Sequence, residues 1–96
     1  MKDIGELIVY GAPWCGDCVR SEALLDRLKI KYEKIDIDKE PEVQDYIKEK
    51  QNGVRKIPHI VFEDGSFLVE PTDEELKNKI QEIIITNESV NWIWKF

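Results

Sequence analysis

The hydrophobic pattern changes its period twice between residues 6 and 38, and this feature restricts the fold more than any other. The compact apolar run of residues 6–10, which Gly11 ends, predicts a short buried strand. From Cys15 to about Ile30 apolar residues recur at helical spacing, and residues 32–38 alternate as a second strand. A strand, a helix and a strand within about thirty residues form a βαβ unit with two parallel, neighbouring strands. The chain therefore belongs to the α/β class.

The next segment predicts a second helix and a hairpin. Pro41 suits the first position of a helix, which Gly53 ends. Two apolar runs follow, at residues 60–62 and 67–69, and Asp64-Gly65 joins them. An Asp-Gly pair between such runs is a strong hairpin signal. The hairpin would extend the parallel pair into a mixed sheet.

The C-terminal quarter predicts a third helix and an extended tail. Thr72 and Glu75 have the spacing of a capping box, which opens a helix. Trp92, Trp94 and Phe96 recur at period two, so we expect residues 86–96 to form an extended, Trp-rich segment laid on the body. The expected fold is one domain, residues 1–96, with a four-stranded mixed sheet, three helices and the order β-α-β-α-β-β-α.

Composition excludes several classes of function. A formal net charge of −6 disfavours nucleic acid as a partner, because phosphate binding needs a basic face. No apolar run approaches the roughly 20 residues that a membrane helix needs, and the start lacks the pattern of a signal peptide. We therefore expect a cytoplasmic protein. A domain stapled by disulfides would carry four or more cysteines, whereas this chain has two.

The two cysteines, Cys15 and Cys18, fall where the first strand ends and the first helix begins. The thiolate is the attacking species in thiol–disulfide exchange, and a helix N-terminus favours an anion through its unpaired N–H groups and its dipole. Cys15 stands at that point and Cys18 one turn inside the helix. We therefore expect Cys15 to attack and Cys18 to resolve the mixed disulfide.

Other side chains are predicted to lie near the cysteines. The Ile57-Pro58 bond precedes the hairpin and could be cis, exposing backbone to a substrate strand, or Pro58 could simply begin an edge strand. Arg55, Lys56 and His59 form a local positive group, either a solvated loop or a rim that binds carboxylates. Trp14 either shields one side of Cys15 or packs against the body.

Two quoted stretches carry a family resemblance. "YGAPWCGDC" and "NGVRKIPHIVFEDGSFLVEP" resemble the thioredoxin-like superfamily, more closely the small glutaredoxins, and most closely the mycoredoxin-type bacterial dithiol glutaredoxins. The likeness spans about residues 7–84. It implies a glutaredoxin-type fold, a cis bond before Pro58, Cys15 as nucleophile and Cys18 as resolving thiol. It also implies reduction of protein disulfides, or of mixed disulfides between a protein and a small thiol.

The sequence departs from that family where glutathione is bound. Glutaredoxins that use glutathione usually carry a lysine shortly before the first cysteine, and residues 11–13 here are Gly, Ala and Pro. They also carry a Gly-Gly and an acidic pair that hold the amino end of glutathione. This chain has Val, Glu, Pro, Thr and Asp at residues 69–73 instead, so only Thr72 and Asp73 remain as partners for a small thiol. The expected substrate- and thiol-binding residues are Trp14, Lys56, Ile57, Pro58, Thr72 and Asp73. Glutathione, mycothiol, bacillithiol or a flavoprotein reductase could then supply the electrons.

The leading hypothesis is a monomeric dithiol oxidoreductase that acts on disulfide-containing proteins or mixed disulfides and has no bound cofactor. A metal-binding module is the alternative. Zinc or an iron–sulfur cluster usually requires four protein ligands. This chain contains two cysteines and the distant His59, so the site would have to be shared between the cysteines of two chains in a dimer. A third reading is a binding module that uses the Trp-rich tail as its contact surface.

Overall fold

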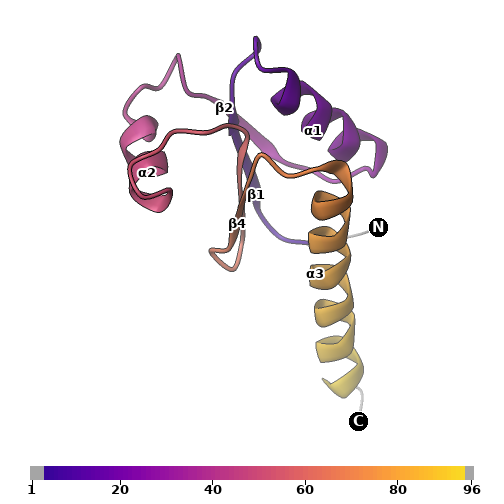
Figure 1. Ribbon diagram of the computed structural model, residues 1–96. Helices are drawn as coiled ribbons and strands as arrows, with labels where there is room; N and C mark the ends of the chain where they lie inside the picture. Colours follow the sequence, from indigo (N-terminus) through magenta and orange to yellow (C-terminus); the bar gives the residue numbers. More distant parts are fainter. Residues whose placement is uncertain (1–3, 95–96) are drawn as a thin grey trace.

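Seven elements follow one another in the predicted order in the computed structural model of the chain (Figure 1). They are β1 (Leu7–Gly11), α1 (Gly16–Arg27), β2 (Glu33–Asp36), α2 (Val43–Lys50), β3 (His59–Phe62), β4 (Phe67–Val69) and α3 (Asp73–Trp94). The structure describes the backbone of residues 4–94 and the side chains of residues 4–85. No helix within that described part is long and apolar enough to cross a membrane.

The four strands form one mixed sheet in the order β2-β1-β3-β4. β1 and β2 are parallel, as the βαβ pattern predicts, and their register pairs Gly11 with Asp36. β3 is antiparallel to both β1 and β4. The predicted hairpin turn is present, with Gly65 at φ +89°, in the left-handed region that glycine favours. The carboxyl end of β1 is thereby placed beside the start of β3.

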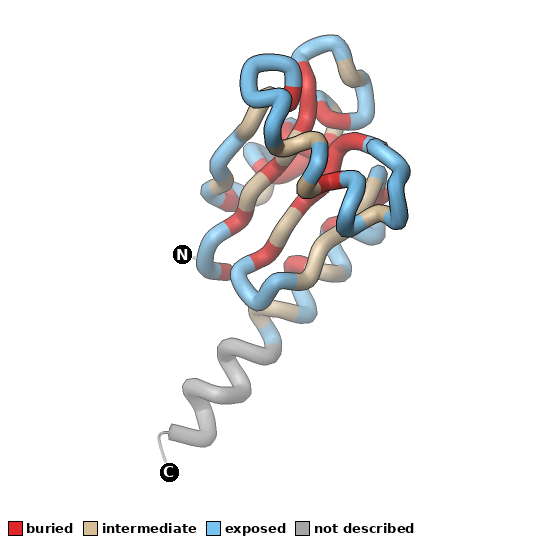
Figure 2. The backbone as a smooth tube through the Cα atoms, turned by 90° about the vertical axis from the view of Figure 1, so that its left-hand side faces the viewer, coloured by how far each residue is buried: buried red, intermediate tan, exposed pale blue. Residues whose placement is uncertain are grey.

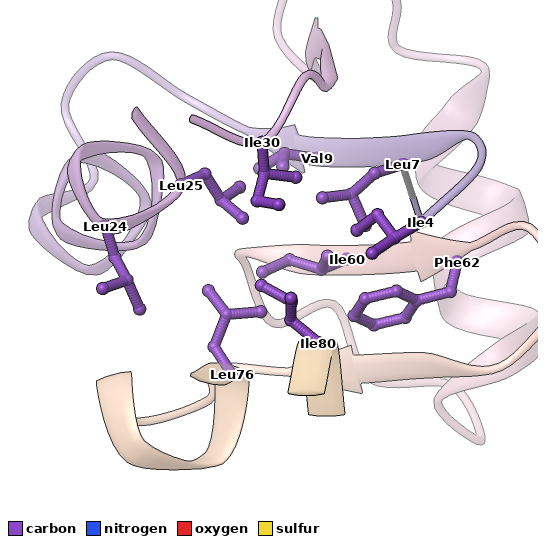
Figure 3. Packing of buried hydrophobic residues seen from close by; sticks show 10 residues of the cluster. All are labelled: Ile4, Leu7, Val9, Leu24, Leu25, Ile30, Ile60, Phe62, Leu76 and Ile80. Atoms are coloured by element: carbon purple, nitrogen blue, oxygen red, sulfur yellow. The ribbon is translucent and has the colours of Figure 1, made fainter. Parts of the chain in front are cut away.

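The sheet has two covered faces because successive strand residues point to opposite sides. α1 and α3 cover one face and α2 lies on the other (Figure 1). The larger apolar cluster lies between the sheet, α1 and α3 (Figure 3), and consists of Ile4, Leu7, Val9, Leu24, Leu25, Ile30, Ile60, Phe62, Leu76 and Ile80. Figure 2 shows buried stretches of backbone in the interior of the domain and exposed stretches at its outer turns.

A smaller cluster contains the second cysteine. Its buried members are Ala12, Cys18, Ile37, Ile47 and Ile57, which come from α1, α2 and three connecting segments. Cys15 and Tyr46 pack against it. The candidate redox pair therefore belongs to a packed unit of its own at one end of the sheet.

α2 begins two residues later than Pro41, at Val43. Its other end agrees with the prediction, because Gly53 adopts φ +92° and its N–H donates to the carbonyl oxygen of Lys48 at 2.6 Å. This is a helix stop of the kind that glycine permits.

The start of α3 is the predicted capping box. The N–H of Glu75 donates to Thr72 Oγ1 at 3.1 Å, and the N–H of Thr72 donates to Glu75 Oε1 at 2.9 Å. Both contacts satisfy donors that have no partner inside the helix.

The extended tail is wrong for most of its length, because α3 continues through Trp92 and Trp94; Phe96 lies outside the described residues. After Pro71 the sequence contains neither proline nor glycine, so nothing in it stops a helix that the capping box has begun. A period-two pattern of three aromatic residues is too short to outweigh that continuity. Figure 1 shows α3 as one helix that projects beyond the sheet.

Candidate active site

Cys15 is the N-cap residue of α1. Its backbone is extended, with φ −88° and ψ 111°, and its Sγ accepts a hydrogen bond from the N–H of Cys18 at 3.2 Å. Its N–H donates to the carbonyl oxygen of Ala12 at 3.1 Å, which closes the turn after β1. The sulfur thus receives an N–H group that has no partner inside the helix, at the positive end of the helix dipole. This is the environment that the sequence predicts for Cys15.

Cys18 has a different environment. Both cysteines are free thiols, but Cys15 is partly exposed and Cys18 has no exposed surface. Burial, followed by the hydrogen bond with Cys15, raises the pKa of Cys18 to about 12, and the carboxylate of Glu22 adds to the rise. At neutral pH Cys18 is therefore protonated in the reduced protein.

Gly11 allows Cys18 to approach the sheet. A Cβ atom on Gly11 would lie 2.8 Å from Cys18 Sγ and 3.1 Å from its Cβ. Buried Glu22 lies on the same side, with Oε2 3.9 Å from that point, and its Oε1 pairs with Lys34 Nζ at 3.1 Å. The last residue of β1 must therefore lack a side chain.

The Ile57-Pro58 bond is cis, and this segment faces the cysteines. Cys15 Sγ lies 3.9 Å from the carbonyl oxygen of Ile57. The carbonyl oxygen of Pro58 accepts from the N–H of Glu70 at 2.9 Å, and the N–H of Lys56 donates to Gln51 Oε1 at 2.9 Å. The structure thus brings Ile57 and Pro58 to the cysteines.

Trp14 lies on the surface beside Cys15. Its side chain is 64% exposed, and its Nε1–H donates to Asp38 Oδ2 at 2.7 Å. Of the two expectations for this residue, packing against the body does not describe it. The hydrogen bond instead holds the indole against the loop after β2.

Asp73 is already engaged by a cation. Arg20 Nη1 lies 2.6 Å from Asp73 Oδ1, and Arg20 also donates to the carbonyl oxygen of Pro71 at 3.0 Å. Asp17 is a third, weaker partner of Arg20, at 3.5 Å. Because Thr72 serves the capping box, the two side chains expected to hold a small thiol are both used within the protein.

The expected positive group is smaller than predicted. His59 is fully buried, and burial followed by the charge of Lys50 lowers its pKa, so it is neutral at pH 7. Its ring meets that of Tyr46 in α2 edge-on, at a centroid distance of 5.9 Å. Arg55 donates to Gln44 at 3.1 Å. Lys56 remains exposed and lines a shallow pocket of about 260 Å³ together with Lys50, Gln51, Val54, Phe67 and Val69.

Three contributors were not singled out as site residues from the sequence: Arg20, Asp38 and Gln51. Arg20 and Asp38 act through partners that are distant along the chain, Asp73 and Trp14. Gln51 instead contacts Lys56 and His59, where the chain folds back after α2. Local periodicity carries no signal for either kind of pair. Within residues 4–85, no group of three His, Cys, Asp or Glu side chains could hold a metal ion.

Comparison with known proteins gives consistent matches. Residues 7–68 match the family model described as Glutaredoxin. A Mycobacterium tuberculosis protein with a provisional glutaredoxin name is 32% identical over 77 residues, which cover 80% of this chain and 92% of that protein. Mycoredoxin 1 of Corynebacterium glutamicum is 27% identical over 78 residues, which cover 81% and 96%. The crystal structure of a glutaredoxin from Archaeoglobus fulgidus superposes with a TM-score of 0.66 at 26% identity, covering 78% of this chain and 85% of that one.

Proposed function

Because the chain belongs to the glutaredoxin family, whose members are thiol–disulfide oxidoreductases, we propose that its activity runs through the dithiol of Cys15 and Cys18. The observation that carries this assignment is the contrast between the two sulfurs. Cys15 Sγ is partly exposed and accepts an N–H at the start of α1, whereas Cys18 is buried and has a raised pKa. The sulfur of Cys15 can therefore reach a substrate disulfide, whereas Cys18 remains a protonated thiol until the mixed disulfide has formed.

The reaction divides into two exchanges. The Cys15 thiolate attacks one sulfur of the substrate disulfide, forms a mixed disulfide and releases the other sulfur as a thiolate, which takes up a proton. Cys18 then loses its proton and attacks Cys15 Sγ, which frees the second substrate thiol and leaves a Cys15–Cys18 disulfide. The substrate disulfide gains two electrons from the two cysteine sulfurs. Of the two protons that it takes up, one comes from Cys18 and the other from the solvent, which received the proton of Cys15 when that thiol ionised.

The proposed substrate surface is the cis-proline segment. A disulfide-bearing strand would lie along the backbone of Ile57 and Pro58, with Trp14 on one side and Lys56 on the other. The exposed indole of Trp14 offers contact area and the ammonium of Lys56 offers a cation for a carboxylate. Extended chains bind folded surfaces through main-chain hydrogen bonds and through contacts of alternate side chains. Protein disulfides and protein mixed disulfides are the substrates that this surface favours.

The ion pair of Asp73 bears on the choice of electron donor. A small thiol with an ammonium group would seek Asp73, but Arg20 holds this carboxylate at 2.6 Å. Thr72 and Asp73 therefore serve a small thiol only as secondary contacts. We propose mycothiol, whose cysteine amine is acetylated, or a flavoprotein reductase as the donor in preference to glutathione and bacillithiol, which both carry an ammonium group.

Single substitutions of the cysteines test the assignment. In reduction of a protein mixed disulfide coupled to NADPH oxidation, Cys15→Ser is expected to abolish turnover. Cys18→Ser is expected to accumulate a covalent adduct at Cys15, visible as a mass increase by intact-protein mass spectrometry. Full activity in Cys15→Ser would overturn the assignment. Running the same assay with glutathione, mycothiol, bacillithiol and a thioredoxin-type reductase ranks the donors.

A further inference from the structure

Gln51 uses both ends of its carboxamide on the residue that precedes the cis-proline dipeptide. Its Oε1 accepts from the N–H of Lys56 at 2.9 Å and its Nε2 donates to the carbonyl oxygen of Lys56 at 2.9 Å. The same Nε2 lies 2.9 Å from His59 Nδ1. The amide thus joins the C-terminal end of α2 to both sides of Ile57-Pro58.

His59 Nδ1 accepts a hydrogen bond from the second N–H of the Gln51 amide, and aromatic rings surround the imidazole. Its ring stacks on Phe67 at a centroid distance of 4.8 Å and meets Tyr10 and Tyr46 edge-on at 6.0 and 5.9 Å. Because Nδ1 accepts from Gln51, the neutral ring carries its proton on Nε2. Burial and the charge of Lys50 lower the pKa of His59 and so maintain that neutral form.

This histidine is costly for the core. Its Nε2 is buried without a hydrogen-bond partner among the described residues, and an unsatisfied buried donor destabilises a fold. A phenylalanine would fill the same space without that cost. What phenylalanine cannot supply is the acceptor at Nδ1, so the advantage of histidine here is its contact with Gln51.

We propose that Gln51 and His59 form a positioning pair that fixes the Lys56–Pro58 segment against Cys15 for substrate binding. This inference rests on the proposed function, because the segment is the proposed substrate surface. The segment is held at two ends, at Lys56 by Gln51 and at Pro58 by the N–H of Glu70 at 2.9 Å. Between these ends the carbonyl oxygen of Ile57 lies 3.9 Å from Cys15 Sγ. Without the pair, the Lys56 end of the segment is no longer held, and the N–H and carbonyl groups of Lys56 form hydrogen bonds with water instead.

The test separates the hydrogen bond from the packing. Gln51→Ala removes the amide, and His59→Phe keeps an aromatic ring but loses the acceptor. His59→Asn loses the ring, while its Oδ1 stands near the position of Nδ1 and still accepts from Gln51. We expect kcat/KM for a peptide mixed disulfide to fall about tenfold in the first two variants, mainly through KM. His59→Asn should stay within about twofold of wild type although its Tm falls. Gln81→Ala, at an exposed position of α3, is the matched control and should change neither quantity.

Two further readouts do not depend on turnover. Alkylation of Cys15 by iodoacetamide does not need the segment and should stay within about twofold in every variant. Hydrogen exchange of the Lys56 amide should accelerate in Gln51→Ala and His59→Phe but not in His59→Asn. Activity that follows Tm across the variants, or unchanged exchange of Lys56 in Gln51→Ala, would overturn the positioning pair. If the wild type reduces no disulfide, the proposed function fails, and the exchange rates alone then decide whether the pair holds the segment.

Discussion

At the scale of single residues, Gly11 is required by contact rather than by backbone conformation. A methyl group there would meet Cys18 Sγ at 2.8 Å, closer than side chains tolerate. We expect Gly11→Ala to lower the free energy of unfolding by about 1–3 kcal/mol and to increase the labelling of Cys18, because its sulfur must move. Urea unfolding and thiol labelling at neutral pH measure both effects.

Gly16 provides the control for this substitution. It is the first residue of α1, and nothing lies within 4 Å of a Cβ atom placed on it. Alanine has the better helix propensity, so Gly16→Ala should raise stability by about 0.5–1 kcal/mol. Equal losses in the two variants would mean that contact with Cys18 is not the reason for glycine at position 11.

His59 predicts a specific dependence of stability on pH. Its pKa in the folded protein lies below 6.5, the ordinary value, so between the two values the unfolded chain binds more protons than the folded one. Stability from this group is therefore complete above pH 6.5 and is lost as the pH falls from there through the folded pKa. Urea unfolding at pH 7.5 and 5 should show a larger loss for the wild type than for His59→Phe, whose carboxylates titrate in the same way. Identical losses would contradict a neutral, buried His59.

At the scale of elements, the start of α3 depends on its capping box. Thr72→Ala removes the acceptor for the N–H of Glu75 and is expected to cost about 1 kcal/mol. Because Thr72 has only a secondary place in the proposed site, turnover with a protein mixed disulfide should change little. Thermal unfolding with Gln81→Ala as control checks the first expectation, and the coupled assay checks the second. A large loss of turnover at unchanged Tm would assign Thr72 a direct part in substrate binding.

The helices and strands also show which structural features can be predicted from short stretches of sequence. The hairpin and the capping box could be predicted because a few adjacent residues determine them, Asp64-Gly65 in one and Thr72 with Glu75 in the other. The prediction of an extended tail was wrong because a helix that has begun continues unless a proline or a glycine ends it. His59 was wrongly assigned to an exposed positive group, because its burial results from the pairing of β3 with β1 and β4, which no short stretch of sequence reveals. Arg20 carries no local signal, since its partner Asp73 lies 53 residues further along the chain. Gln51 carries none because its contacts with Lys56 and His59 depend on how the chain folds back after α2.

At the scale of the whole molecule, the topology followed from the βαβ pattern and the hairpin, and it places both cysteines at the end of β1. The two apolar clusters stabilise different parts of the molecule. The larger one joins the sheet to α1 and α3. The smaller one contains Cys18 and Ile57 and has Cys15 at its margin. Cavities in the two clusters should therefore have similar effects on stability and different effects on chemistry.

Ile47 and Ile80 make that comparison possible, since each is almost fully buried, at 0% and 3% exposure, in the smaller and the larger cluster respectively. Each Ile→Val substitution removes one methylene group and should cost about 0.5–1.5 kcal/mol. Only Ile47→Val loosens the packing beneath Ile57 and Cys18, so it alone should slow reduction of a mixed disulfide, by about threefold. Chemical unfolding shows whether the two variants are matched in stability, and the coupled assay compares their rates. If Ile80→Val slows the reaction as much, global stability rather than the local cluster sets the geometry of the site.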